Sequence, residues 1–212
     1  MPSRLLLASL VALCGACATL DENQCRSGDW RQIGYQDGLR GHAGTRLSEH
    51  QKSCAEHGVV GDANAWQIGY VQGQGQFCTA RNGYEHGREG HRYGDVCPPE
   101  MDALFRPAYT DGRRVSALRE EVSALERRLV EVDSRLQDDD RRGAAYLDAV
   151  RSGRKPTEPP ALLRVDERTR LEREYVDLSH AYHHLLEELE EDDAALSARY
   201  QATPLRFEFN RY

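Results

Sequence analysis

Ile33-Gly34-Tyr35-Gln36-Asp37-Gly38 is the stretch that decides the fold, because its Gly-Tyr-x-x-Gly pattern returns three more times along the chain. The two glycines of a copy are four residues apart, so they lie on one face of a helix. The last copy begins with alanine, which indicates that this position requires a small residue. Irregular spacing of the copies excludes a solenoid of fixed period. The repeat residues are Gly34, Gly38, Gly69, Gly73, Gly83, Gly87 and Gly112, with Ala108 in the remaining place.

These glycines carry an energetic penalty that the fold must offset. A glycine inside a helix costs about 1 kcal/mol relative to alanine, and the sum approaches the ~5–15 kcal/mol net stability of a domain. Two compensations are predicted. Small residues on one face allow two helix backbones to approach closely, and each disulfide that closes a loop of this size contributes roughly 2–4 kcal/mol. An apolar membrane version of the motif is excluded, because polar residues such as Asp37 and Glu85 interrupt it.

The amino terminus predicts a lipoprotein signal peptide over residues 1–16. An apolar run too short to span a membrane ends in small residues before Cys17. This order resembles a bacterial lipobox, so Cys17 is the predicted site of acylation. Cys14 competes with it but follows a bulky residue, and ordinary secretion is the alternative to anchoring. Several acyl chains give stable anchoring, and the alanine after Cys17 indicates, by resemblance to such lipoproteins, the periplasmic face of the outer membrane.

Removing the signal peptide leaves an even number of cysteines besides Cys17 in an oxidising compartment, which predicts two disulfides. Sequence alone allows three pairings. We favour the sequential pairing, because each loop then contains one repeat copy and closes a short hairpin. It joins Cys25 to Cys54 and Cys78 to Cys97. A zinc site is disfavoured, since no two cysteines have the Cys-x-x-Cys spacing.

Capping and turn residues divide residues 17–114 into short helices. Ser27 or Asp29 caps the first helix, and Asp62 caps the third. Adjacent prolines at 98 and 99 mark a stop and a restart. The expected helices run over residues 30–39, 46–57, 62–77 and 82–90.

Several of these features together resemble a known family. The residues that carry the resemblance include Cys25-Arg26-Ser27-Gly28-Asp29-Trp30, Arg46-Leu47-Ser48-Glu49-His50, Asn82-Gly83-Tyr84 and Val96-Cys97-Pro98. Their combination over about residues 17–115 is similar to the uncharacterised bacterial lipoproteins of the DUF2799 family, a domain of unknown function. The resemblance implies an envelope lipoprotein and supplies no catalytic residues.

Residues 115–203 are charged and periodic, and they predict an antiparallel helical hairpin. Apolar residues three and four apart form the seam of a coiled coil, and the turn lies near 153–160. Each arm reaches about forty residues, roughly 60 Å. In this register Arg119 meets Asp193, and an intermolecular coiled coil is the alternative. The seam comprises Val115, Leu118, Val122, Leu125, Leu129, Val132 and Leu136, then Leu171, Tyr175, Leu178, Tyr182, Leu185, Leu189 and Leu196, with Asp192 as a flaw.

Two groups of histidines are candidates for chemistry, and each has a simpler explanation. His180 and His184 have the spacing of metal ligands, but both fall on outward heptad positions without a third ligand, so no metal site is predicted. His86 and His91, with glutamates nearby, could supply an acid or a base. Five residues apart, they are expected to diverge around a helix.

Charge and missing motifs limit the remaining function classes. A net charge of -7 and the acidic run over 187–193 argue against nucleic-acid binding. Hydrolase and nucleotide-binding motifs are absent, so no catalytic residue and no cofactor is predicted. Trp30 and Trp66 could stack on a sugar, although buried packing is favoured. The tail, residues 204–212, alternates like a short strand that either adds to a partner's sheet or folds onto the hairpin.

The sequence therefore predicts an all-α protein, in which a small disulfide-stapled helical domain is followed by a long antiparallel hairpin. The expected function is that of a non-enzymatic envelope lipoprotein, held at the membrane by acyl chains on Cys17, whose hairpin or tail contacts another envelope protein. The alternative is a module that binds a small ligand or peptidoglycan through the aromatic and glycine-rich domain. A hydrolase ranks third, because no nucleophile is paired with a base.

Overall fold

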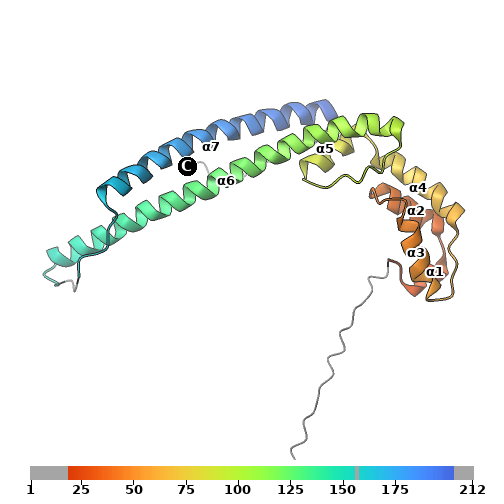
Figure 1. Ribbon diagram of the computed structural model, residues 1–212, viewed down its shortest axis with the longest axis horizontal. Coiled ribbons are helices and arrows are strands. Elements are labelled where there is room, and N and C mark those ends of the chain that lie inside the picture. Colours follow the sequence, from red (N-terminus) through yellow and green to blue (C-terminus); the bar gives the residue numbers. More distant parts are fainter. Residues whose placement is uncertain (1–18, 156–157, 203–212) are drawn as a thin grey trace, which may run out of the picture. The chain divides into compact units, whose positions relative to one another are not determined.

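The computed structural model describes residues 19–155 and 158–202, and the described chain is all-helical (Figure 1). The predicted signal peptide, Cys17 and the tail lie outside the described residues. The chain divides into two compact units. Unit 1 is Met1–Cys78 with Gly94–Pro98, and unit 2 is Thr79–Tyr93 with Pro99–Tyr212. The predicted fold class, a disulfide-stapled helical domain followed by a long hairpin, is confirmed.

Unit 1 contains α1 (Glu22–Ser27), α2 (Trp30–Leu39), α3 (Arg46–Ala55) and α4 (Ala63–Phe77). Two of its helices begin at predicted caps: the Asp29 carboxylate accepts a hydrogen bond from Gln32 N–H, and the Asp62 carboxylate accepts one from Ala65 N–H, both at 2.9 Å. Helix α1 was not predicted. The sequence feature that could have predicted α1 is the capping box that Asp21 and Gln24 form at its start.

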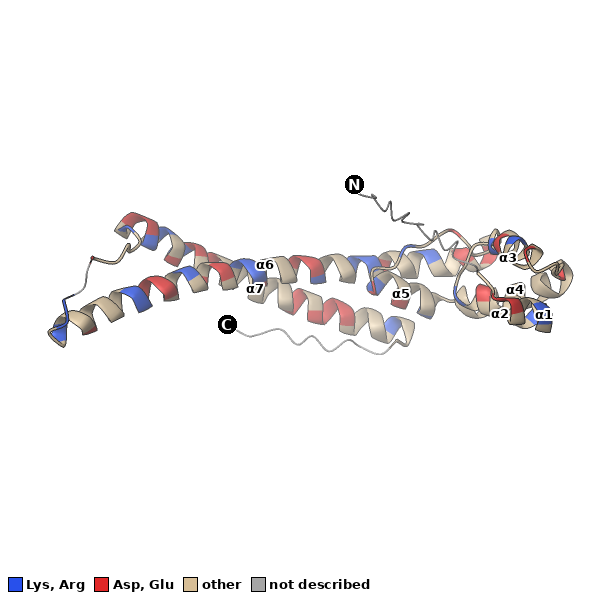
Figure 2. Cartoon of the chain, turned by 90° about the horizontal axis from the view of Figure 1, so that it is seen from below, with Lys and Arg blue, Asp and Glu red and all other residues tan. Residues whose placement is uncertain are grey.

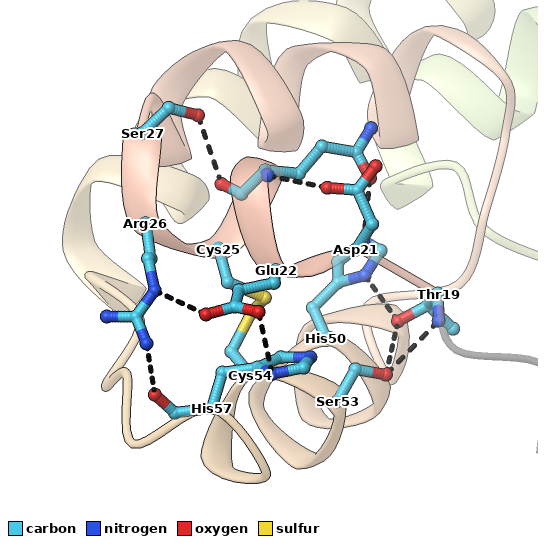
Figure 3. The surroundings of a disulfide bond; sticks show 11 residues. Thr19, Asp21, Glu22, Cys25, Arg26, Ser27, His50, Ser53, Cys54 and His57 are labelled. Atoms are coloured by element: carbon cyan, nitrogen blue, oxygen red, sulfur yellow. Dashed lines mark hydrogen bonds and ion pairs between the residues drawn. A yellow bond between two sulfur atoms is a disulfide. The ribbon is translucent and has the colours of Figure 1, made fainter.

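The core of unit 1 lies where α1 and α3 meet the pair α2 and α4. Two disulfides close it, joining Cys25 to Cys54 and Cys78 to Cys97, which is the pairing that the loop argument favoured. The first connects α1 with α3 (Figure 3). The buried apolar residues of this core are Leu20, Cys25, Trp30, Cys54, Trp66 and Tyr70.

Unit 2 contains α5 (Ala80–Arg88), α6 (Pro99–Arg151) and α7 (Val165–Tyr200). Helix α6 restarts at the predicted proline and continues past residue 115 without a break, so it includes the fourth repeat copy as well as the first arm of the hairpin. From residue 115 the first arm runs to Arg151 and the second arm is α7, 36 residues long, so the two arms have nearly equal lengths, close to the predicted forty residues. No helix in the described part of the chain combines the length and the apolar character needed to cross a membrane.

Helices α6 and α7 of the same chain pack against each other in antiparallel orientation. Arg135 near the far end of α6 forms an ion pair with Glu167 in the first turn of α7, while Arg114 pairs with Asp192. Acidic and basic residues are interspersed along α6, whereas acidic residues follow one another along the second half of α7 (Figure 2). The buried seam residues include Val115, Val122, Leu129 and Val132 on α6, and Leu171, Tyr182, Leu186, Leu189 and Leu196 on α7.

One polar position of the seam differs from the prediction. The buried carboxylate is Asp193, which is 1% exposed, whereas Asp192 is half-buried and pairs with Arg114. Asp193 does not meet Arg119. Instead Arg88 on α5 forms its ion pair at 3.3 Å, and Arg119 Nη2 donates to the Arg88 carbonyl. The predicted register treated the hairpin as two helices, but α5 is a third helix beside it.

Candidate functional site: the paired helices and the Asp37 pocket

Each unit contains one pair of parallel helices built from two repeat copies. In unit 1 the first copy, on α2, contacts the second copy, on α4. In unit 2 the third copy, on α5, contacts the fourth, on α6. The parallel direction follows from the contacts, because Gly34 faces Trp66 and Gly38 faces Tyr70, so the residue numbers rise together on both helices.

The glycines bring the two backbones of each pair into direct contact. A Cβ on Gly34 would lie 2.0 Å from the Trp66 carbonyl oxygen, and a Cβ on Gly69 would lie 1.8 Å from the Arg31 oxygen. No side chain fits at such distances. This close approach is one of the two predicted compensations for the glycine penalty.

The two pairs share one register. In unit 1 the second glycine of a copy faces the carbonyl of the partner's tyrosine, and a Cβ on Gly73 would lie 2.0 Å from Tyr35 O. In unit 2 a Cβ on Gly87 would lie 2.1 Å from Tyr109 O in the same way. The helix pair of unit 2 therefore repeats the helix pair of unit 1.

Ala108 marks where the second pair is looser. It is fully buried, yet it carries the methyl group that its counterparts lack. Opposite it, a Cβ on Gly83 would lie 2.5 Å from Phe105 O, further than the 2.0 Å and 1.8 Å at the equivalent glycines of unit 1. The helices of unit 2 are thus slightly further apart at this end.

A tyrosine of each pair is buried and hydrogen-bonded. The Tyr70 hydroxyl donates to the His42 carbonyl at 2.7 Å, and its ring stacks on Trp66 with centroids 4.6 Å apart. The Tyr84 hydroxyl donates to Asp193 at 2.8 Å, and burial raises the pKa of Tyr84 to about 12. Both hydroxyls therefore form hydrogen bonds within the protein that stabilise the fold.

Asp37, inside the first repeat, is a buried carboxylate with two partners. Its Oδ2 accepts a hydrogen bond from Trp66 Nε1–H at 2.9 Å and lies 2.9 Å from His50 Nε2. The side chains of His50 and Asp37 are only 3% and 7% exposed. Burial opposes ionisation of Asp37, but the hydrogen bonds from His50 and Trp66 outweigh it and hold the pKa of Asp37 below its usual value.

The same network fixes the start of the described chain. His50 Nδ1 lies 2.7 Å from Thr19 Oγ1, and Thr19 N–H donates to Ser53 Oγ at 3.1 Å (Figure 3). The next residue, Leu20, is buried in the core. Sequence reasoning missed this cluster, because positions 19, 37 and 50 have no regular spacing that would connect them.

Thr19, His50 and Asp37 stand in the order of a hydroxyl, base and acid triad, but the geometry does not support catalysis. In a serine-protease triad the histidine turns Nε2 to the nucleophile and Nδ1 to the acid. Here the two nitrogens are exchanged. His50 is also buried, so its nitrogens are not open to a substrate. The network acts as a structural tie between the chain start, α2, α3 and α4.

A pocket of about 240 Å³ lies beside this tie. Thr19 and Leu20 form part of its wall, and three basic side chains from the α2–α3 connection and the first residue of α3 form another part. Those basic residues are Arg40, His42 and Arg46.

The histidine candidates from the sequence are placed as follows. His180 and His184 are exposed on α7. Among residues 19–155 and 158–202, no three His, Cys, Asp or Glu side chains come together to hold a metal. The expected divergence of His86 and His91 was wrong: α5 ends before Gly90, whose φ of 79° turns the chain back, and the rings lie 5.0 Å apart.

The two tryptophans have no free face. Trp30 is 4% exposed and Trp66 is 1% exposed, as the packing interpretation predicted. Stacking of these rings on a sugar would require opening the core of unit 1.

Comparison with known proteins gives one match. Residues 29–114 match the DUF2799 family, described as a protein of unknown function. The matched region covers both helix pairs, from the cap of α2 to the end of the fourth repeat copy. No curated protein and no solved structure shows significant similarity to the chain.

Proposed function

The chain belongs to the DUF2799 family through residues 29–114, and from this premise we propose that it is a non-enzymatic lipoprotein of the bacterial envelope. Acyl chains on Cys17 hold it on the periplasmic face of the outer membrane, and the α6–α7 hairpin contacts another envelope protein. The hairpin is the observation that carries the proposal, because a long exposed pair of helices offers surface for a partner rather than an enclosed site for chemistry.

The far end of the hairpin supports a contact with a partner. Arg168, in the first turns of α7, pairs with Asp139 of α6 at 2.9 Å, so the last turns of α6 extend beyond the start of α7 (Figure 1). Leu147 and Val150 on this extension are 52% and 51% exposed. Single exposed apolar residues are ordinary, but several together at one end of a helix mark a site of association. Leu162, 48% exposed, and Val165, 84% exposed, lie in the adjoining connection and first turn of α7.

Point variants test this proposal better than deletion of the hairpin, because α7 supplies Asp193 to the core of unit 2. The variant Leu147→Glu/Val150→Glu places charge on the apolar extension. Ala145→Glu, also exposed but on the opposite side of α6, is the matched control. Envelopes are crosslinked, the protein is recovered, and the crosslinked partners are quantified by mass spectrometry.

We expect the crosslinked amount of the main partner to fall at least tenfold in the double variant and to stay at the wild-type level in the control. Identical partner profiles for wild type, double variant and control would contradict the proposal. Mass spectrometry of the amino-terminal peptide tests the anchor separately, since an acylated Cys17 has a defined added mass.

The alternative function drawn from the sequence relied on aromatic rings that a ligand can reach. Trp30 and Trp66 are buried, so that version of a sugar-binding or peptidoglycan-binding module is not proposed.

A further inference from the structure

We propose that the pocket beside Thr19 binds the phosphodiester group of a membrane glycerophospholipid. This inference rests on the proposed anchor at Cys17 and names a ligand for the part of unit 1 next to it. Three observations carry the inference: the charge of the pocket wall, the distance from the pocket to the anchor, and the pocket volume.

The pocket wall contains two arginines, one of which has no counter-charge among the described residues. The guanidinium of Arg40 has no ion pair or hydrogen bond among the described residues. Arg46 pairs with Glu49 through Nη1 at 2.7 Å, but its Nε is buried and has no hydrogen-bond partner there. The Arg46 side chain is 32% exposed, so an anionic oxygen in the pocket would contact the guanidinium of Arg40 and the exposed part of the Arg46 guanidinium.

The wall also contains three other titratable groups, Asp37, His42 and His50. Asp37 is the acidic residue among them; it contributes one negative charge, and its Oδ2 is held by hydrogen bonding with Trp66 and His50. His42 faces the same pocket and adds a further donor. Bidentate arginine is the side chain best suited to a phosphate, so two arginines on one wall favour this ligand class.

The pocket lies within a short reach of the proposed anchor. Thr19 is fixed to His50 and Ser53, and Cys17 precedes it by two residues. Two extended residues span at most about 7 Å. An acylated Cys17 would therefore hold the mouth of the pocket at the level of the lipid headgroups rather than far out in the periplasm.

The volume matches a headgroup and not a whole lipid. At about 240 Å³ the pocket is smaller than the roughly 300–1,000 Å³ of sites for drug-sized ligands. It can take a phosphate with its glycerol, while the acyl chains stay in the bilayer. Gln32 and Gln36 line the same pocket and offer amide groups to the hydroxyl and ester oxygens of the glycerol.

The test uses the mature full-length chain with Cys17→Ser, so its result does not depend on lipidation. Nitrogen-15 NMR follows the Arg46 Nε–H signal during titration with dihexanoyl phosphatidylglycerol below its micelle concentration. Dihexanoylglycerol has the same chains without phosphate, and glycerol 3-phosphate has the phosphate without chains. Arg40→Gln/Arg46→Gln removes the two pocket charges, and Arg81→Gln, an exposed residue of unit 2, is the matched control.

We expect phosphatidylglycerol to shift the Arg46 Nε–H signal, dihexanoylglycerol to leave it unchanged, and glycerol 3-phosphate to bind more weakly. In Arg40→Gln/Arg46→Gln, binding followed on the signals of His42 and Gln36 should weaken at least tenfold, while Arg81→Gln binds as wild type does. Equal binding by Arg40→Gln/Arg46→Gln, or a shift with dihexanoylglycerol alone, overturns the phosphate site. Tighter binding of glycerol 3-phosphate than of the lipid overturns the lipid and leaves a free phosphate ester as the ligand.

Discussion

Both helix pairs are joined by the same kind of glycine contact. They differ in whether the repeat or the third helix supplies the buried carboxylate beside the pair. In unit 1 the repeat itself supplies the carboxylate, Asp37, and a third helix, α3, supplies His50. In unit 2 the third helix, α7, supplies the carboxylate, Asp193, and the repeat supplies Tyr84 and Arg88. Glycine contacts therefore align two backbones, whereas buried polar contacts select the helix that covers them.

The pairs also differ in covalent support. Both disulfides lie in unit 1, and unit 2 has instead the long apolar seam between α6 and α7. Unit 1 is small, and small domains bury too little surface to be stable without such crosslinks.

Reduction of the disulfides should lower the unfolding free energy of unit 1 much more than that of unit 2. Each bond contributes roughly 2–4 kcal/mol, so unit 1 should lose about 4–8 kcal/mol of unfolding free energy. Both tryptophans lie in unit 1, so urea unfolding followed by their fluorescence reports on it, whereas far-UV circular dichroism is dominated by α6 and α7. A loss of the same size in both signals would contradict the assignment of the disulfides to unit 1 alone.

Asp193→Ala should damage unit 2 severely. The substitution leaves the Arg88 guanidinium buried without its carboxylate, which costs about 3–5 kcal/mol. Asp177→Ala changes an exposed aspartate on the same helix and should have little effect. Urea unfolding followed by circular dichroism at 222 nm measures both. If the two variants are equally stable, Asp193 does not hold α7 against α5.

Gly69→Ala tests how closely the helices of unit 1 approach. The new methyl carbon would lie 1.8 Å from Arg31 O, so α2 and α4 must separate, at a cost of about 3 kcal/mol. Gly44→Ala is the control, because a methyl group there meets nothing within 4 Å. Tryptophan fluorescence in urea gives the difference between the two variants, and a stable Gly69→Ala protein would refute direct backbone contact.

The two units should lose stability at opposite ends of the pH scale. Tyr84 has a folded pKa of about 12 against 10.0 in the unfolded chain, so its contribution is complete below pH 10 and is lost as pH rises toward 12. The shift corresponds to about 2–3 kcal/mol. Asp37 has a folded pKa below 3.8, so its contribution to unit 1 is present above that pH and is lost as pH falls through the folded value.

Unfolding free energies measured across both ranges check these signs. Tyr84→Phe should flatten the alkaline loss in unit 2, and Asp37→Asn should flatten the acid loss in unit 1. If the fluorescence and circular dichroism transitions of the wild-type protein respond identically to pH, the two units do not differ in the pH dependence of their stability.

Ala108→Gly should have the smallest effect. Unit 2 already accommodates the methyl group, so its removal only adds the helix penalty of glycine, about 1 kcal/mol. Circular dichroism in urea detects a change of this size. A stabilised variant would mean that the methyl group strains the pair and that unit 2 needs glycine there as unit 1 does.

Local features of the fold could be predicted from the sequence because they depend on neighbouring residues. The caps at Asp29 and Asp62, the restart at Pro99 and the hairpin seam all follow from short-range rules. The partner of each repeat copy could not be predicted. Four similar copies present the same small surface, and nothing in a single copy distinguishes one possible partner from another.

The candidate site was largely invisible in the sequence for the same reason. Asp37 looked like a polar interruption of the repeat, and its burial depends on Trp66 and His50, which come from two other helices. The burial of Asp193 was not predicted, because heptad counting placed Asp192 in the seam and paired Asp193 with Arg119. The shift arises because α5 packs beside the hairpin and draws Asp193 inward through Tyr84 and Arg88.

Helix α6 has a mechanical consequence for unit 2. Its 53 residues form one rod of roughly 80 Å, with the fourth repeat copy near its first end and the apolar extension at the other. A sideways force on the extension acts through this lever on the contact between α5 and α6. Pro107 lacks the N–H that an unbroken helix needs, so the rod bends most easily one residue before Ala108, at the loosest point of that contact.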